Sequence, residues 1–309
     1  MADSFDPAQA AAYEELMRQW IPPAPRVTPV IPPKVETVYV LSRVTLGADI
    51  KITSIMLDAM KKRFPEAEVI FVAGKKSAEL FANVKHLEAS YPRGGSIADR
   101  IAFARSLPLD TRNSIVVDPD SRITQLGLIP LGDPAYYFHF PSRTANGASN
   151  LTDITTRWLE QTFGQSGEAF IHPAAVPIDD PRPRVAVSLG VGENESKRIP
   201  GAFESNLLHD LSRRYATLWL DRGAGGEEAA RVTAAAAGLE NIRFWEGSFA
   251  GFASIISQCD HYVGYDSAGQ HAAAACGTPL TAYFAGAPSE RFRQRWAPSG
   301  RGPIEVIVP

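Results

Sequence analysis

The sequence has 309 residues, of which 45% are hydrophobic and 21% are charged, and its formal net charge is −3. A chain of this length holds about two domains, each large enough for its own core. The small net charge gives no reason to expect nucleic acid or an anionic membrane surface as a general partner.

Two cysteines, Cys259 and Cys276, stand without a Cys-x-x-Cys pair or a histidine at metal-ligand spacing, which argues against a disulfide framework and a metal site. No apolar run approaches the roughly 20 residues of a membrane span. The first residues lack the basic region and apolar core of a signal peptide. We therefore expect a cytoplasmic protein without a transmembrane segment.

The N-terminal residues 1–34 predict a helix followed by a proline-rich arm. Residues 5–20 suit one helix, with Asp6 as N-cap and Pro7 in the first turn. Six prolines then fall between Ile21 and Pro33, a composition typical of a stiff, extended segment outside the core.

Strands and helices alternate from Val35 onward, which predicts a parallel sheet covered on both faces. The first domain, residues 35–165, has expected strands at 37–41, 68–72, 84–87, 114–118 and 136–140, and expected helices at 49–64, 77–81, 96–107 and 151–163. Few apolar residues recur in 166–182, which we interpret as a linker. The second domain, residues 183–309, has expected strands at 185–189, 217–220, 242–245, 261–264, 280–285 and 304–308, and expected helices at 203–215, 227–237, 249–259 and 269–276.

The pattern favours an α/β fold with two Rossmann-like domains facing a cleft. Ligands of such sheets sit beyond the carboxyl ends of the strands. That rule predicts that residues 45–49, 190–197 and 266–271 lie at the cleft.

The stretch Tyr262–Ala285 predicts one strand–helix–strand unit. Asp266 and Ser267 supply an N-cap signal for its helix, and Gly277 is a typical helix stop. The free N–H groups and the dipole at this helix N-terminus favour an anion, so we predict a phosphate site there.

Four segments resemble glycosyltransferase family 9, the bacterial heptosyltransferase-type enzymes with the two-domain GT-B fold. They are Val40–Asp49, the run Ser196-Lys197-Arg198-Ile199-Pro200, the turn Gly247-Ser248, and Asp266–His271. The sequence also departs from the family pattern. Ala48 is inserted between Gly47 and Asp49, Ala268 replaces a glycine that comes one residue later as Gly269, and Ser188-Leu189 stands where the family often has His-Pro. No C-terminal helix is evident after Val308.

The resemblance implies a metal-independent inverting glycosyltransferase in cell envelope glycan biosynthesis. Its donor would be a nucleotide-diphosphate sugar similar to ADP-heptose, bound by the second domain without further cofactor. Its acceptor would be a glycan or a lipopolysaccharide-type glycolipid, bound by the first domain. A membrane-bound acceptor would bring the protein to the inner face of the membrane.

Transfer from such a donor needs a base for the acceptor hydroxyl and positive charge for the departing diphosphate. Asp49 is our candidate base, although its position also suits a helix cap. Lys197 is the candidate phosphate ligand, although surface lysines are common in such loops. Arg43 and Thr45 are candidates for acceptor binding, with a solvated arginine as the alternative for Arg43.

The remaining donor-site candidates are Ser248, in the Gly247-Ser248 turn, and five residues of the segment before and within the expected 269–276 helix: Asp266, Ser267, Ala268, Gly269 and His271. His271 lies four residues after Ser267, hence on the same helix face, and could donate to the leaving phosphate or be a histidine satisfied within the interdomain wall. Asp266 is suited to orienting loop N–H groups or binding a sugar hydroxyl, because like charges repel. Glu228 would bind ribose hydroxyls or only favour the start of its helix.

Two further patterns have simpler explanations. Asp118-Pro119-Asp120 matches the metal-holding Asp-x-Asp of another glycosyltransferase fold, but a turn explains it. The glycines around Gly223 lack the Gly-x-Gly-x-x-Gly pattern, which argues against a nicotinamide cofactor. Two alternatives to a transferase stay open: a sugar-nucleotide epimerase, and a catalytically silent relative that binds nucleotide or glycan or serves as a partner protein.

Overall fold

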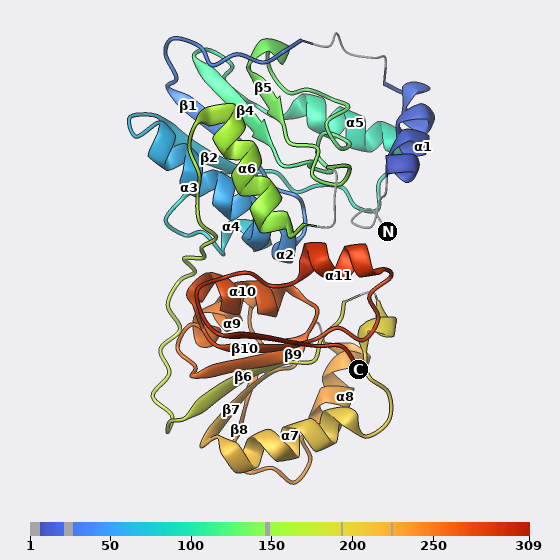
Figure 1. Cartoon of the computed structure of the whole chain (residues 1–309), viewed down its shortest axis with the longest axis vertical. Coiled ribbons are helices and arrows are strands. Elements are labelled where there is room, and N and C mark those ends of the chain that lie inside the picture. The colour runs from blue at the N-terminus through green and yellow to red at the C-terminus, as the bar shows by residue number, and fades with distance from the viewer. Residues whose placement is uncertain (1–6, 22–26, 146–148, 193, 224) are drawn as a thin grey trace. The chain divides into compact units, whose positions relative to one another are not determined.

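The structure, a computed structural model, describes residues 7–21, 27–145, 149–192, 194–223 and 225–309. The chain divides into two compact units, Met1–Ala169 and Phe170–Pro309 (Figure 1). Each unit is a parallel α/β structure with its own sheet, in agreement with the alternation of strands and helices in the sequence.

Unit 1 contains a five-stranded sheet, with all neighbouring strands parallel in the order β3-β2-β1-β4-β5. Its strands are β1 (Thr37–Leu41), β2 (Glu68–Ala73), β3 (Lys85–Glu88), β4 (Ser114–Asp118) and β5 (Tyr137–His139). Its α-helices are α1 (Pro7–Arg18), α2 (Leu46–Ala48), α3 (Ser54–Arg63), α4 (Lys75–Ala78), α5 (Ile97–Ser106) and α6 (Leu151–Phe163). The strand order reverses between β1 and β4.

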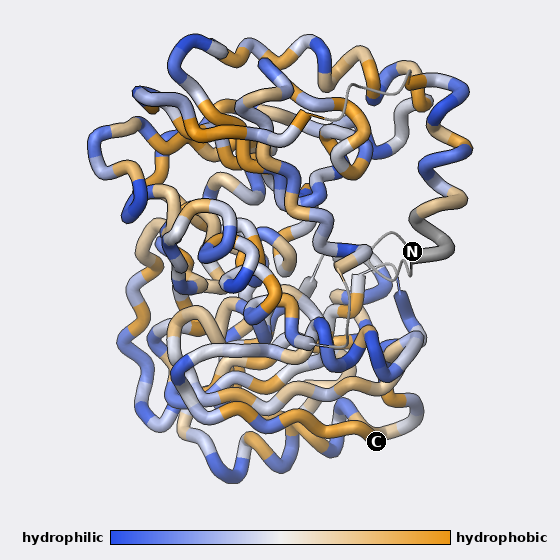
Figure 2. Tube along the Cα trace, turned by 45° about the horizontal axis from the view of Figure 1, so that its top comes forward, coloured by the Kyte–Doolittle hydropathy of each residue, from blue (hydrophilic) through white to orange (hydrophobic). Residues whose placement is uncertain are grey.

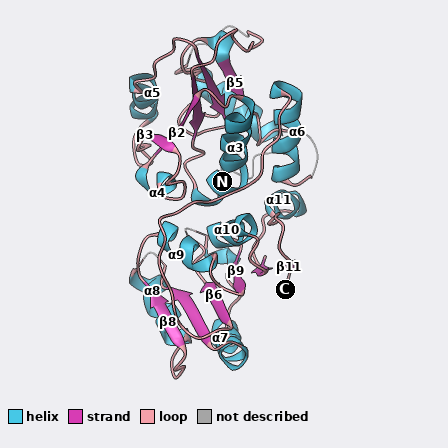
Figure 3. Ribbon diagram, turned by 90° about the vertical axis from the view of Figure 1, so that its left-hand side faces the viewer, coloured by secondary structure: helices cyan, strands magenta, loops and turns pink. Residues whose placement is uncertain are grey.

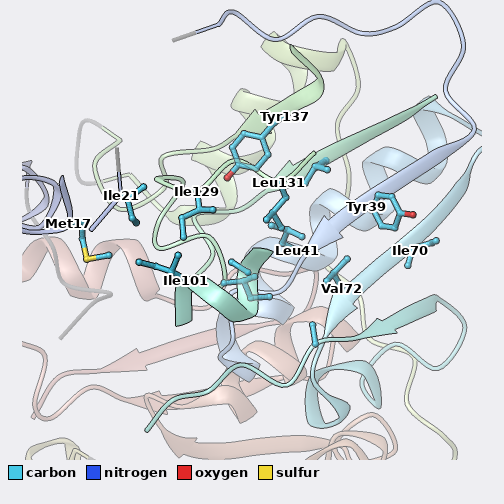
Figure 4. Packing of buried hydrophobic residues seen from close by; sticks show 14 residues of the cluster. Met17, Ile21, Tyr39, Leu41, Ile70, Val72, Ile101, Ile129, Leu131 and Tyr137 are labelled. Atoms are coloured by element: carbon cyan, nitrogen blue, oxygen red, sulfur yellow. The ribbon is translucent and has the colours of Figure 1, made fainter. Parts of the chain in front are cut away.

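The first helix of the chain contributes to the core of unit 1. Met17 of α1 and Ile21 are buried in one cluster with Leu41, Ile101 and Ile129 (Figure 4). The proline-rich composition favoured a segment outside the core, yet Ile21 is only 7% exposed. The start of the arm is therefore part of the core of unit 1. The predicted cap Asp6 lies outside the described residues.

The first βα connection differs from the sequence prediction. The helix expected at 49–64 begins earlier, at Leu46, with Thr45 as N-cap. A π-helical turn at Asp49–Thr53 then joins α2 to α3. The prediction that Asp49 caps this helix was wrong, because the residue lies one turn inside it. The short helix expected at 77–81 is α4, which begins at Lys75.

Unit 2 contains a six-stranded parallel sheet in the order β11-β10-β9-β6-β7-β8. Its strands are β6 (Arg184–Ser188), β7 (Thr217–Asp221), β8 (Ile242–Trp245), β9 (His261–Tyr265), β10 (Leu280–Tyr283) and β11 (Ile304–Ile307). Its α-helices are α7 (Phe203–Arg214), α8 (Gly226–Ala235), α9 (Phe249–Ile256), α10 (Ala268–Cys276) and α11 (Glu290–Trp296). The strand order reverses between β6 and β9.

The strands supply much of each core, because side chains alternate across a sheet whose two faces are covered by helices (Figures 2 and 3). In unit 2, Val185 and Val187 of β6 lie in one cluster with Leu208 of α7 and Val232 of α8. The sequence prediction missed α11, whose Trp296 is buried. The stop at Gly277 is confirmed, since this residue ends α10 with a left-handed φ of 74°.

Candidate functional site

Lys197 and Asp266 meet where the strand order of unit 2 reverses. The segments that carry them follow β6 and β9, which pair directly. The Nζ atom of Lys197 lies 2.8 Å from Oδ2 of Asp266 and donates a hydrogen bond to the Asp266 carbonyl at 3.0 Å. It also lies 5.6 Å from the centroid of the Phe292 ring of α11. The structure thus places an ammonium group at the position where ligands of parallel sheets bind.

A buried carboxylate anchors the segment next to Lys197. Glu204, at the start of α7 and 5% exposed, pairs with Arg198 at 3.4 Å and with Arg231 of α8. It also accepts a hydrogen bond at 3.1 Å from the hydroxyl of Tyr265, which itself accepts one from the Ile199 N–H. Sequence reasoning missed this network, because its hydrogen-bonded members are up to 66 positions apart.

The predicted N-terminus of α10 begins at Ser267, whose backbone is extended and whose side chain does not cap the helix. Asp266 does not cap it either, since its Oδ1 atom accepts a hydrogen bond at 2.7 Å from Nε2 of Gln270. The side chain of Asp266 therefore bridges Lys197 and the first turn of α10.

Gly269 is needed for the close approach of α10 to the sheet. A Cβ atom at this position would lie 2.1 Å from the hydroxyl oxygen of Tyr262, a fully buried side chain of β9. Ala268, one residue earlier, is half-buried and begins the helix. The glycine that the family pattern places earlier is thus required one residue later in this chain.

His271 is 5% exposed and lies inside unit 2, with its ring centroid 6.0 Å from that of Trp296. Its predicted contact with a leaving phosphate stays a prediction.

Glu228, near the start of α8, lies over the loops that follow β6 and β7. A Cβ atom at Gly223 would be 1.6 Å from its Oε1 atom, and one at Gly190 would be 3.0 Å away. Glycines at both positions leave room for the carboxylate where it lies. Burial raises the pKa of the neighbouring Asp221, and the charge of Glu228 adds to that rise.

Ser248 lies at the start of α9. It caps α9 by accepting a hydrogen bond at 3.2 Å from the Gly251 N–H. It follows the edge strand β8, which is separated from β9 by β6 and β7. The helix that it caps packs against α10, and the predicted contact of Ser248 with the donor stays a prediction.

Asp49 is buried in unit 1 with 0% exposure. Its Oδ2 atom accepts a hydrogen bond from the Ser42 hydroxyl at 2.7 Å, and its Oδ1 atom accepts from the Arg43 N–H at 2.7 Å and from the Thr53 hydroxyl at 2.9 Å. Burial raises the pKa of the Asp49 carboxyl, and these hydrogen bonds act against the rise. A raised pKa suits a general base, whereas contact between this fully buried carboxyl and an acceptor requires surrounding residues to move.

Arg43 is 1% exposed, so the alternative of a solvated arginine was wrong. Its guanidinium donates to the Pro119 carbonyl at 3.2 Å and to the Ser142 hydroxyl. Its predicted contact with an acceptor gains no support from this position. Thr45 is half-buried beside it and has no side-chain capping bond.

The Asp118-Pro119-Asp120 segment follows β4, next to the loop after β1. Asp118 accepts hydrogen bonds from the Ser121 N–H and from the Tyr137 hydroxyl. Asp120 has a left-handed φ of 71° and pairs with His139 at 3.2 Å. The expected turn is present, but the partners of Asp120 were not predicted.

The described part of the chain contains no group of three or more His, Cys, Asp or Glu side chains placed to hold a metal ion. Within the same residues, no helix is long and apolar enough to cross a membrane.

Comparisons with known proteins connect this geometry to a family. The family model described as glycosyltransferase family 9 (heptosyltransferase) matches residues 135–302, more than half of the chain. Curated protein sequences give no match.

Solved structures resemble the whole chain at low sequence identity. A glycosyl transferase family 9 structure from Veillonella parvula DSM 2008 has 16% identity and a TM-score of 0.67, covering 89% of this chain and 86% of that one. E. coli heptosyltransferase WaaC with ADP has the same identity and TM-score, with 88% and 93% covered. E. coli ADP-heptose lps heptosyltransferase II has 18% identity and a TM-score of 0.59, with 88% and 90% covered.

These similarities establish the fold, and the predicted α/β class of GT-B type with two Rossmann-like domains is confirmed. Together with the family match, they lead to one conclusion: the chain belongs to glycosyltransferase family 9 and is a glycosyltransferase.

Proposed function

We propose that the protein is a metal-independent inverting transferase that moves a sugar from a nucleotide-diphosphate donor, of the ADP-heptose type, to a glycan or lipopolysaccharide-type acceptor. The observation that carries this proposal is the position of Lys197 at the β6/β9 switch point, against the N-terminal turn of α10. Similar structures titled as a heptosyltransferase with ADP and as an ADP-heptose transferase support the choice of donor.

Unit 2 would bind the donor through its diphosphate. Lys197 would neutralise the negative charge that develops on the leaving group, while the N–H groups of the first turn of α10 donate to phosphate oxygens. Asp266 holds Lys197 in place and, as an anion, would contact a sugar hydroxyl rather than a phosphate. Glu228, lying over two glycine-containing loops, has the position and the acceptor oxygens to bind ribose hydroxyls.

Unit 1 would bind the acceptor. Asp49 is the proposed base, because its raised pKa favours proton uptake and because it follows the first strand of the unit. Proton transfer requires the acceptor hydroxyl within hydrogen-bond reach. Because Asp49 is fully buried, surrounding residues would move when an acceptor binds.

The test uses the purified chain with ADP-, UDP- and GDP-sugars in EDTA. We expect an ADP-sugar to raise the Tm and to be turned over in the presence of a glycan acceptor. Lys197→Ala should lower kcat by about 10²-fold or more, as is common when a charge-stabilising donor is removed. The control Lys76→Ala, an exposed lysine of unit 1, should leave turnover unchanged.

The role of the base is tested separately. Asp49→Asn should lower turnover by about 10²–10⁴-fold while the Tm rise with nucleotide persists. Full turnover of this variant would refute the base assignment. A requirement for added divalent metal would refute metal independence, and failure of every nucleotide to stabilise the protein would refute the proposed function as a whole.

A further inference from the structure

A small cavity of about 60 Å³ opens in unit 1 between α1 and the carboxyl ends of β4 and β5. Its main lining residues are Tyr13, Asp120, Leu126, Leu128, His139 and Arg143. Water occupies about 30 Å³ per molecule in the liquid, so the cavity has room for one small polar group rather than for a whole ring. It therefore suits the end of a ligand that extends outside it.

The polar residues that line the cavity form a hydrogen-bonded cluster around Asp120. Asp120, 4% exposed, faces His139 Nε2 at 3.2 Å and accepts a hydrogen bond from the Arg143 N–H at 2.8 Å. Burial alone would raise the pKa of Asp120, but His139 and Arg143 outweigh it and hold the value at about 2. The carboxylate is therefore charged and fixed.

His139 lines this space, and its side chain is 27% exposed. Its Nε2 atom faces Asp120, and among the described residues no protein group is bonded to its Nδ1 atom. Gly127, with a φ of 83°, lies against the imidazole, and a Cβ atom there would be 2.4 Å from the ring. A glycine is thus required to let the ring occupy this position.

The N-terminal helix α1 supplies the aromatic side chain that lines the cavity. Tyr13 of α1 donates a hydrogen bond to Oε1 of Gln125 at 3.2 Å, and Met17 fastens the same helix into the core of unit 1. Leu126 and Leu128 add apolar surface beside Tyr13. The cavity thus combines aromatic and aliphatic side chains with polar ones. This combination suits a sugar, which has apolar C–H faces and polar hydroxyl edges.

The charges of the cavity favour a neutral ligand. The positive groups, Arg143 and His139, already face the carboxylate of Asp120, and Glu14 adds a further carboxylate at the exposed rim. An anion would meet two negative groups, whereas a hydroxyl can both donate and accept.

We propose that this cavity binds a hydroxyl group of a neutral sugar, with Nδ1 of His139 as its hydrogen-bond partner, Asp120 fixing the imidazole ring, and Tyr13 covering an apolar face of the sugar. With Nε2–H donated to Asp120, Nδ1 of His139 accepts from the ligand hydroxyl when the ring is neutral and donates to it when the ring is protonated. Burial lowers the pKa of His139, but Asp120 and Asp118 outweigh this effect and raise the value. The inference rests on the proposed function only for the origin of the sugar, which would be the acceptor glycan.

The experiment is an NMR titration of the full-length chain, labelled with ¹⁵N-histidine, with neutral methyl glycosides and with inorganic phosphate. His139→Gln assigns the His139 signals, and the exposed His86 serves as an internal reference. Methyl glycosides should shift the His139 Nδ1 signal saturably, while phosphate should not. Tyr13→Ala should weaken this binding about tenfold, whereas Tyr13→Phe, which keeps the ring, should bind within a few-fold of the wild type.

The proposal is overturned if no glycoside shifts His139, if phosphate alone does so, or if Tyr13→Ala binds as tightly as Tyr13→Phe while both variants keep the wild-type Tm. The titration contains no donor. Absence of sugar binding in a protein that is still stabilised by an ADP-sugar therefore refutes this site alone, and absence of transfer with intact sugar binding refutes only the proposed reaction.

Discussion

Gly269→Ala should disturb the N-terminus of α10 through one buried contact. The added Cβ atom would lie 2.1 Å from the hydroxyl oxygen of Tyr262 and 2.6 Å from its Cζ atom. Both distances are far below the ~3.5–4.0 Å of an ordinary carbon contact. Tyr262 is fully buried in β9, so neither partner can move away without displacing the helix or the strand.

The expected cost combines two opposing effects. Overpacking of a tight core site costs about 1–3 kcal/mol. Alanine is favoured over glycine within a helix by about 1 kcal/mol, which offsets part of this cost. We therefore expect a net loss of up to about 2 kcal/mol, equivalent to a Tm decrease of up to roughly 8 °C for a unit of this size. Binding of an ADP-sugar should weaken as well, because the displaced turn carries the N–H groups proposed for the diphosphate.

Thermal unfolding followed by near-UV circular dichroism measures the effect, and a double-mutant cycle with Tyr262→Phe tests its cause. Removing the hydroxyl should recover about 1 kcal/mol in the Gly269→Ala background, through a favourable coupling between the two changes. Ala268→Gly is the matched control one residue earlier, where less than 1 kcal/mol is expected. Absence of coupling with Tyr262→Phe would contradict the argument.

Three further changes test other contacts. Glu204→Gln should cost about 3–5 kcal/mol in chemical denaturation, because it leaves two arginines facing a neutral group in a buried site. Gly286→Ala should weaken ADP-sugar binding about tenfold in a calorimetric titration, since its Cβ atom would lie 2.7 Å from the Lys197 backbone nitrogen, whereas Gly94→Ala, with open space around it, should bind normally. Asp120 has a folded pKa of about 2 against an ordinary value of 3.8, so it stabilises the fold by about 2 kcal/mol above pH 4, and this contribution is lost as the pH falls toward 2. Stability measured against pH should fall less steeply in this range for Asp120→Asn.

The repeated strand–helix units could be predicted from the sequence because their signals are local. The run after Tyr262 combines a short apolar strand, a small-residue helix and Gly277, whose φ of 74° few other residues adopt readily. The position of Lys197 beside Asp266 follows from parallel strand order together with the resemblance to the family. Neither inference needed a contact between distant side chains to be known in advance.

What the sequence could not reveal depends on such distant contacts. Arginine is usually a surface residue, but Arg43 is buried and donates a hydrogen bond to the hydroxyl of Ser142, which is 99 positions away. Asp120 and His139 face each other because β4 and β5 are neighbours in the sheet, which spacing alone does not specify. The prediction missed α11 because most of its residues are charged or polar, while its anchor Trp296 lies at the end of the helix.

The departures from the family pattern at Ala48 and Ala268 have physical compensation in this chain. Ala48 is one additional residue before Asp49, and the π-helical turn that begins at Asp49 takes up an extra residue within the connection to α3. Ala268 replaces a glycine, while Gly269 supplies the missing side-chain space where Tyr262 reaches the helix. The helix accommodates the Ala48 insertion, so the segment that carries Asp49 still follows β1 directly. Gly269 takes the place of the earlier glycine, so the segment 266–271 still follows β9 directly. The Ala48 insertion and the Ala268 substitution therefore give no physical reason to expect loss of activity. Deletion of Ala48 should be harmful, because it removes the residue that the π turn accommodates.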